Sequence, residues 1–125
     1  MRTGKIEINK KEYLLCFSTR TIMAFSERFG SVEKAFSALS KGTESEQLEI
    51  SFWMLATLME AGGRYAKAEG LENPKPLSYD ELLDTCDFLD LALAQKRIFE
   101  SIELGSKREV EVEPEKKNAK ATQLK

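Results

Sequence analysis

The chain has 125 residues, of which 42% are apolar and 32% charged, and this length and composition fit one domain and exclude two. It has no histidine and two cysteines, Cys16 and Cys86, so it lacks the commonest general base and cannot build a thiolate metal cage. The net charge of −2 gives no general attraction to nucleic acid or to an anionic membrane. No stretch approaches the ~18–20 apolar residues of a membrane helix, and the first twenty residues have no apolar signal core. We therefore expect a soluble cytoplasmic protein with two reduced thiols.

The N-terminal segment predicts a β-hairpin. Apolar residues recur at every second position in residues 5–8 and again in residues 12–17, which is the period of a strand. Asn9, Lys10 and Lys11 form the expected turn. Lys10 stands where a glycine would avoid the steric cost of a positive φ, because tight hairpin turns favour Asn-Gly.

Two amphipathic helices are expected next. The first begins at Ser18 or Thr19 and ends at Gly30, and its apolar residues repeat with helical spacing on one face. Ser31 is expected to cap the second helix, which stops before Gly42. Both helices therefore present one apolar face to a core.

A long helix is predicted to follow Thr43, because Thr43 and Glu46 have the spacing of a capping box. Its core stripe consists of Leu48, Phe52, Leu55, Met59, Gly62 or Gly63, and Ala66. Residues 50–59 contain no charge, so the helix is expected to be buried on more than one side. Gly62 and Gly63 predict a kink or a close helix crossing.

After a proline-marked loop at residues 70–77, a second capping box, formed by Ser78 and Glu81, predicts a last helix that runs unbroken to Leu104. This helix has two apolar stripes. One consists of Leu82, Cys86, Leu89 and Leu93, and the other of Phe88, Leu91, Ile98, Phe99 and Ile102. Residues 105–125 are expected to form a flexible charged tail. The predicted fold is mainly α (α+β): one domain over residues 1–104, with a short hairpin and about four helices, the last two long.

One domain of this size needs only one of these stripes for its core, so the excess apolar surface predicts an interface with a partner or with a second copy. The predicted interface residues are Ile50, Trp53, Met54, Leu58, Phe88, Leu91, Ile98, Phe99 and Ile102.

Other chemistry has less support. Asp80, Asp84, Asp87 and Asp90 line one arc of the predicted last helix and could hold a divalent cation, but without a histidine or a second acidic cluster a solvated acidic face is the favoured explanation. The cysteines lack a histidine or CxxC partner and are expected to be buried structural thiols. No nucleotide-binding or nucleophile motif occurs.

Four segments carry a resemblance to a known family: EYLLCFS at residues 12–18, TRTIMAFSERFG at 19–30, LMEAG at 58–62 and LSYDELLD at 77–84. In this order, separated by the proline-marked loop, they resemble the tail assembly chaperones of long-tailed bacteriophages and prophages over roughly residues 5–104. The resemblance implies a non-enzymatic protein, without cofactor or metal, that coats the helical tape measure protein in the bacterial cytoplasm and is absent from the finished virion.

Members of that family often exist in a short form and a longer, frameshifted form, and the extension is thought to recruit tail tube subunits. This chain resembles the short form, and Lys116-Lys117 is where we place a possible frameshift.

The alternative function is a small helical DNA-associated regulator that uses the basic tail together with Arg20 and Arg28 on phosphates. A metal-dependent hydrolase built on the four aspartates is a third possibility, and it requires a bound divalent ion.

Overall fold

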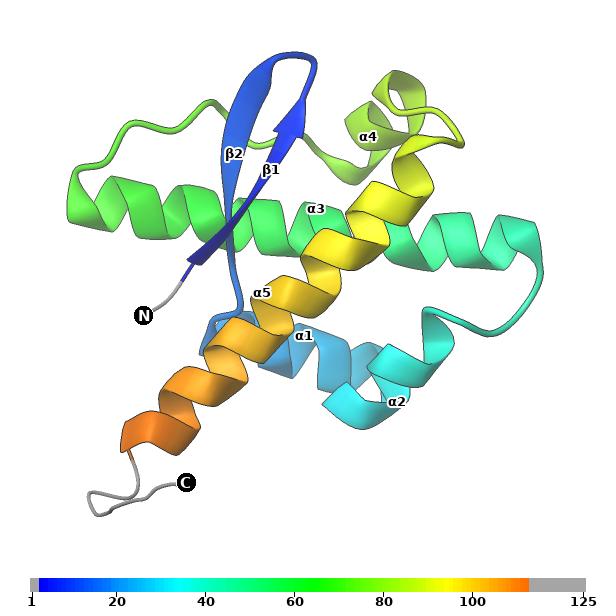
Figure 1. The fold of residues 1–125 in the computed structure, drawn as a ribbon, viewed down its shortest axis with the longest axis horizontal. Coiled ribbons are helices and arrows are strands. Elements are labelled where there is room, and N and C mark those ends of the chain that lie inside the picture. The colour runs from blue at the N-terminus through cyan, green and yellow to red at the C-terminus, as the bar shows by residue number, and fades with distance from the viewer. Residues whose placement is uncertain (1–2, 113–125) are drawn as a thin grey trace.

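The computed structural model describes residues 3–112 and shows a β-hairpin followed by five helices within that range (Figure 1). The elements are β1 (Thr3–Ile8), β2 (Lys11–Cys16), α1 (Thr19–Phe29), α2 (Val32–Ala38), α3 (Glu44–Glu69), α4 (Tyr79–Thr85) and α5 (Asp90–Val112). The predicted class, mainly helical with a small β part, is confirmed.

The hairpin forms around the turn expected from the sequence. β1 and β2 pair antiparallel, with Thr3 opposite Cys16 and Ile8 opposite Lys11. Asn9 and Lys10 connect the strands with φ values of 51° and 66°. Positive φ at both central residues is typical of a type I′ turn, whose twist matches that of the strands. Lys10 therefore adopts the backbone conformation for which glycine is preferred.

Polar side chains and glycines set the ends of α1, α2 and α3 as the sequence predicts. Ser18 and Ser31 accept hydrogen bonds from backbone N–H groups in the first turns of α1 and α2. Gly30 ends α1 with a φ of 100°. Thr43 and Glu46 form the predicted capping box at the start of α3. Local hydrogen bonding thus accounts for these boundaries.

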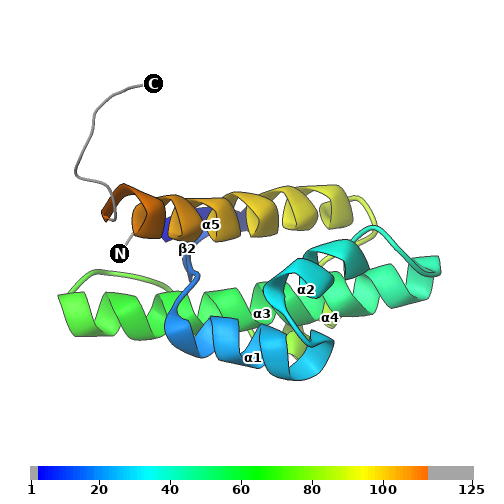
Figure 2. The same cartoon turned by 90° about the horizontal axis from the view of Figure 1, so that it is seen from below.

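Helix α3 is the central element of the fold. It packs against β2, α1, α4 and α5, and Figure 2 shows α5 above it and α1 below. Residues of all these elements contribute to one buried apolar cluster. Gln95 joins three of the helices, because its Nε2 donates to the Leu39 carbonyl at the end of α2 (2.9 Å) and to Ser51 Oγ on α3 (3.1 Å).

The glycine pair in α3 lies where other backbone approaches closely. A Cβ on Gly62 would stand 1.9 Å from the carbonyl oxygen of Leu14, and a Cβ on Gly63 would stand 2.6 Å from Cγ of Pro76. The predicted close helix crossing is therefore wrong: strand β2 and the loop after α3, not another helix, approach the glycine pair. Glycine is required at position 62 because backbone atoms cannot move aside as a flexible side chain can.

The predicted last helix is divided in two, which corrects the expectation of one unbroken helix from residue 78 to 104. The Ser78–Glu81 capping box is present, but α4 ends at Thr85, and the backbone of the next residue, Cys86, is extended. Asp87 then caps α5: its Oδ1 accepts from the N–H groups of Leu89 and Asp90, and Asp90 Oδ2 accepts from the Asp87 N–H. This reciprocal pair starts a new helix, as a capping box does.

The boundary of the predicted tail also changes. Helix α5 passes through Gly105 and continues to Val112, so residues 105–112 are helical rather than part of a flexible segment. One glycine costs about 1 kcal/mol in a helix, and extending an existing helix through good helix formers such as Lys, Arg and Glu offsets that cost. The rest of the predicted tail, with Lys116-Lys117, lies outside the described residues.

Candidate functional site

Four of the predicted interface residues lie in the core, which corrects their assignment to a partner surface. Met54, Leu58 and Ile98 are 0% exposed, and Ile102 is 1% exposed. The reason is the central position of α3. Because β2, α1, α4 and α5 cover it on several sides, the apolar surface around α3 and the inner face of α5 are used within the chain.

Trp53, Ile50 and Leu91 are half-buried and pack against the edge of this core. The Trp53 ring lies 5.8 Å from the Phe25 ring and 6.0 Å from the Phe29 ring. The Arg28 guanidinium stands over Trp53, 4.6 Å from the ring centroid. The interactions of Trp53 are thus made largely inside the chain.

Arg28 is held in this position by an ion pair with Glu49 on α3. Tyr79 lies in the same neighbourhood, and its pKa is raised, first by burial and then by the Glu49 carboxylate. Beside it, a shallow groove of about 610 Å³ includes Trp53, Thr57 and Tyr79 in its lining. The groove has a mixed polar and apolar wall.

Three of the exposed large apolar residues lie where α4 passes into α5, and the others among the described side chains, Met23, Leu71 and Phe99, lie elsewhere in the chain. Phe88 is 56% exposed and Leu89 is 84% exposed, and both belong to the short connection at residues 86–89. Leu83, in the preceding helix, is 43% exposed. We call Leu83, Phe88 and Leu89 the corner patch. Leu89 was expected in the core stripe with Leu82, and the break in the helix is what turns it outward.

Phe99 forms a second exposed apolar site on α5. It is 41% exposed, and its ring stacks on that of Phe36 from α2, with the centroids 4.8 Å apart. Of the predicted interface residues, Phe88 and Phe99 are therefore the two that are exposed. Leu89 is absent from the predicted interface because a single helix places it in the stripe with Leu82, and Leu83 is absent because it belongs to neither predicted stripe. The signal that could have revealed them is the Asp87-x-x-Asp90 spacing, which matches that of a capping box.

The four aspartates do not form one arc. Asp80 lies in the first turn of α4 and Asp84 is exposed near its end, whereas Asp87 and Asp90 cap α5. Among the side chains that the structure describes, in residues 3–104, no group of three or more His, Cys, Asp or Glu residues could hold a metal ion. Hydrogen bonds to the start of α5 explain two of the four carboxylates.

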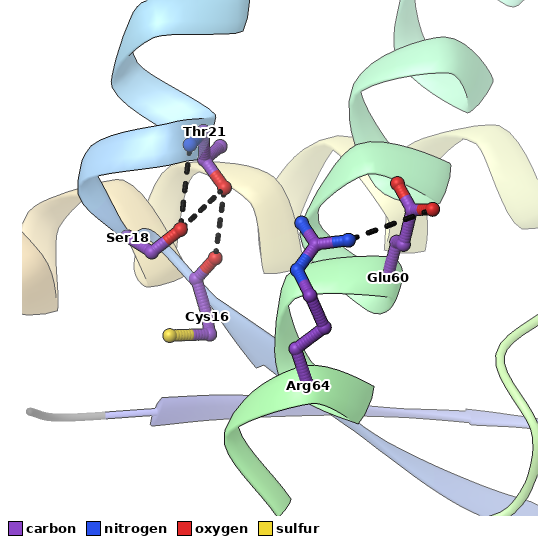
Figure 3. A network of polar contacts seen from close by, with 5 residues as sticks. All are labelled: Cys16, Ser18, Thr21, Glu60 and Arg64. Carbon is purple, nitrogen blue, oxygen red and sulfur yellow. Dashed lines mark hydrogen bonds and ion pairs between the residues drawn. The ribbon is translucent and has the colours of Figure 1, made fainter. Parts of the chain in front are cut away.

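The two cysteines form no disulfide with each other and lie in different environments. Cys16 is buried beside the N-terminus of α1, where its carbonyl accepts from Thr21 Oγ1 at 3.4 Å and Ser18 caps the helix (Figure 3). Arg64 and Glu60 form an ion pair nearby, at 3.6 Å. Burial raises the pKa of Cys16. Burial first, and then Asp90 and Asp87, raises the pKa of Cys86 to about 11.

The geometry defines a mainly helical α+β domain with a two-stranded hairpin packed on a central helix. In the part of the chain that the structure covers, no helix is both long enough and apolar enough to cross a membrane. Comparison with protein-family models, curated proteins and solved structures gives no match.

Proposed function

We propose that this chain is a non-enzymatic phage tail assembly chaperone that binds and solubilises the tape measure protein in the bacterial cytoplasm. The proposal rests on the family resemblance of residues 5–104 and on one structural observation, the exposed corner patch. Leu83, Phe88 and Leu89 expose large apolar side chains within seven residues of sequence. Such concentrated apolar exposure is typical of a protein-binding surface.

The corner patch is suited to this role because capped helices hold it on both sides. Ser78 and Glu81 fix the start of α4, and Asp87 and Asp90 fix the start of α5. The apolar side chains are thereby presented with little conformational entropy to lose on binding. A tape measure protein with long apolar helix faces could dock there, and many copies along one client would add avidity.

The alternative DNA-associated regulator loses part of its support. Arg28, which it would place on a phosphate, pairs with Glu49 and stands over Trp53.

In the chaperone proposal, a longer frameshifted form would recruit the tail tube protein. Reading the gene around the codons of Lys116 and Lys117 tests that part of the proposal.

The test is co-expression with the tape measure protein of the same gene cluster. We expect the wild-type chain to keep that protein soluble and to co-purify with it, and we expect Phe88→Glu and Leu89→Glu to abolish both effects. Met23→Glu is the matched control, because Met23 is 66% exposed but lies on α1, away from the corner patch in the chain. Circular dichroism of each variant checks the fold.

If the tape measure protein precipitates equally with and without the wild-type chain, the chaperone proposal is wrong. If it stays soluble but Met23→Glu is as damaging as Leu89→Glu, the corner patch is the wrong surface. Trp53 is not a suitable test position, because a charge there would disrupt its packing with Phe25 and Phe29.

A further inference from the structure

The outer edge of β1 is open, whereas the outer edge of β2 is covered. Leu14 is paired with Lys5, but its N–H donates to Asn73 Oδ1 (2.9 Å) and its carbonyl lies against Gly62. Leu14 therefore points its backbone groups out of the ladder. In an antiparallel ladder, pairs whose backbone groups bond to each other alternate with pairs whose backbone groups point away from each other. Lys5 and, two residues on, Glu7 belong to the second kind, so their N–H and C=O groups point out of the free edge of β1.

Nothing in the described chain occupies that second edge. Within residues 3–112, the backbone groups of Lys5 and Glu7 have no hydrogen-bond partner outside the hairpin. Helix α5 packs on a face of the hairpin instead, since a Cβ on Gly4 would meet Ser101 Oγ at 2.6 Å. An open strand edge of this kind is a template for pairing with another strand.

Strand β1 exposes two charged side chains, Lys5 and Glu7, and they differ in the charge that faces them on β2. The Nζ of Lys5 lies 3.8 Å from the Oε1 of Glu12, so these two side chains form an ion pair. Glu7, in contrast, stands directly opposite Glu12 in the register, and like charges in that position are destabilising. Lys5 and Glu7 are both exposed, on the face opposite to buried Ile6. Among the described residues, Glu7 therefore has no positively charged residue paired with it in the ladder.

We infer that β1 pairs antiparallel with β1 of a second copy, with Ile6 opposite the second copy's Ile6, to give a four-stranded sheet. In this register, Lys5 of each chain stands opposite Glu7 of the other. Both residues point their backbone groups outward, so each pair exchanges two hydrogen bonds. The register supplies Glu7 with a lysine on its open side, and this charge complementarity identifies a second copy as the occupant.

The test is sedimentation equilibrium of the wild-type chain and of three charge variants. We expect the wild-type chain to dimerise, and Lys5→Glu and Glu7→Lys each to lower the association constant about tenfold, because two attractive cross-strand pairs become repulsive. The double variant Lys5→Glu/Glu7→Lys should restore it to within about threefold. Glu7→Lys also places a lysine opposite Glu12, so its loss of dimer cannot be attributed to a weaker hairpin.

Mixing the two single variants is the sharpest arm of the experiment. A Lys5→Glu chain and a Glu7→Lys chain have fully complementary edges in this register, so the mixture should form a heterodimer that is tighter than the homodimer of either variant. A wild-type chain that stays monomeric up to about 0.5 mM overturns the inference and indicates that the charges protect the edge instead. Dimerisation that none of the charge changes alters overturns it as well. The result does not depend on whether the tape measure protein is the client.

Discussion

At the scale of single residues, Lys10 is the clearest case of a backbone position occupied by an unfavourable residue. Its φ of 66° is one that glycine adopts without steric cost. We expect Lys10→Gly to raise the free energy of unfolding by about 0.5–1 kcal/mol, measured by urea denaturation. Lys11→Gly is the matched control and should lower it, since Lys11 belongs to β2 and has no positive φ. Equal effects of the two changes would contradict this account.

Cys86 allows a second prediction at this scale. Its pKa of about 11, against an ordinary 9.0, means that the thiolate is scarce in the folded chain and appears only as the pH rises toward 11. At pH 8, alkylation by iodoacetamide should therefore be about a hundredfold slower in the folded chain than in urea, as both the pKa difference and limited access oppose it. The measurement uses a Cys16→Ser background. Equal rates in both states would show that Cys86 is not shielded.

At the scale of elements, the separation of α4 from α5 depends on the Asp87 cap. We expect Asp87→Ala to lower the free energy of unfolding by about 1 kcal/mol, because the N–H groups of Leu89 and Asp90 lose their acceptor. Asp84→Ala should change it by less than about 0.5 kcal/mol, since Asp84 is exposed and has no hydrogen bond with the described residues. Thermal denaturation with and without magnesium measures both. Equal, magnesium-dependent losses would instead support a cation on the aspartates.

The elements also show which signals in the sequence are reliable. Thr43 with Glu46, Ser78 with Glu81, and Gly30 mark helix ends through hydrogen bonds and backbone conformations that are local in sequence, and all three predictions are confirmed. Asp87 and Asp90 have the same spacing as a capping box, but they sit inside a run of helical periodicity. Helical periodicity on both sides of them predicts one long helix, and the structure contradicts that prediction.

At the scale of the whole molecule, the distinction between core and exposed apolar residues can be measured directly. Met54→Ala should cost about 2–5 kcal/mol of stability, because Met54 is fully buried and its truncation leaves a cavity. Phe88→Ala should cost less than about 1 kcal/mol, because Phe88 is more than half exposed. Urea denaturation of both variants gives the comparison. Similar losses would show that the corner patch is packed rather than exposed.

The sequence by itself determined the hairpin, the helical class and most helix boundaries, because these depend on residue periodicity, capping side chains and glycines within a few positions of one another. It also located Phe88 and Phe99 as candidate interface residues. Periodicity shows that a helix has a second apolar face, but it does not show whether a partner or the same chain covers it. Only the tertiary structure decided that β2, α1, α4 and α5 surround α3, so that Met54 and Leu58 are core, whereas Leu83, Phe88, Leu89 and Phe99 are exposed.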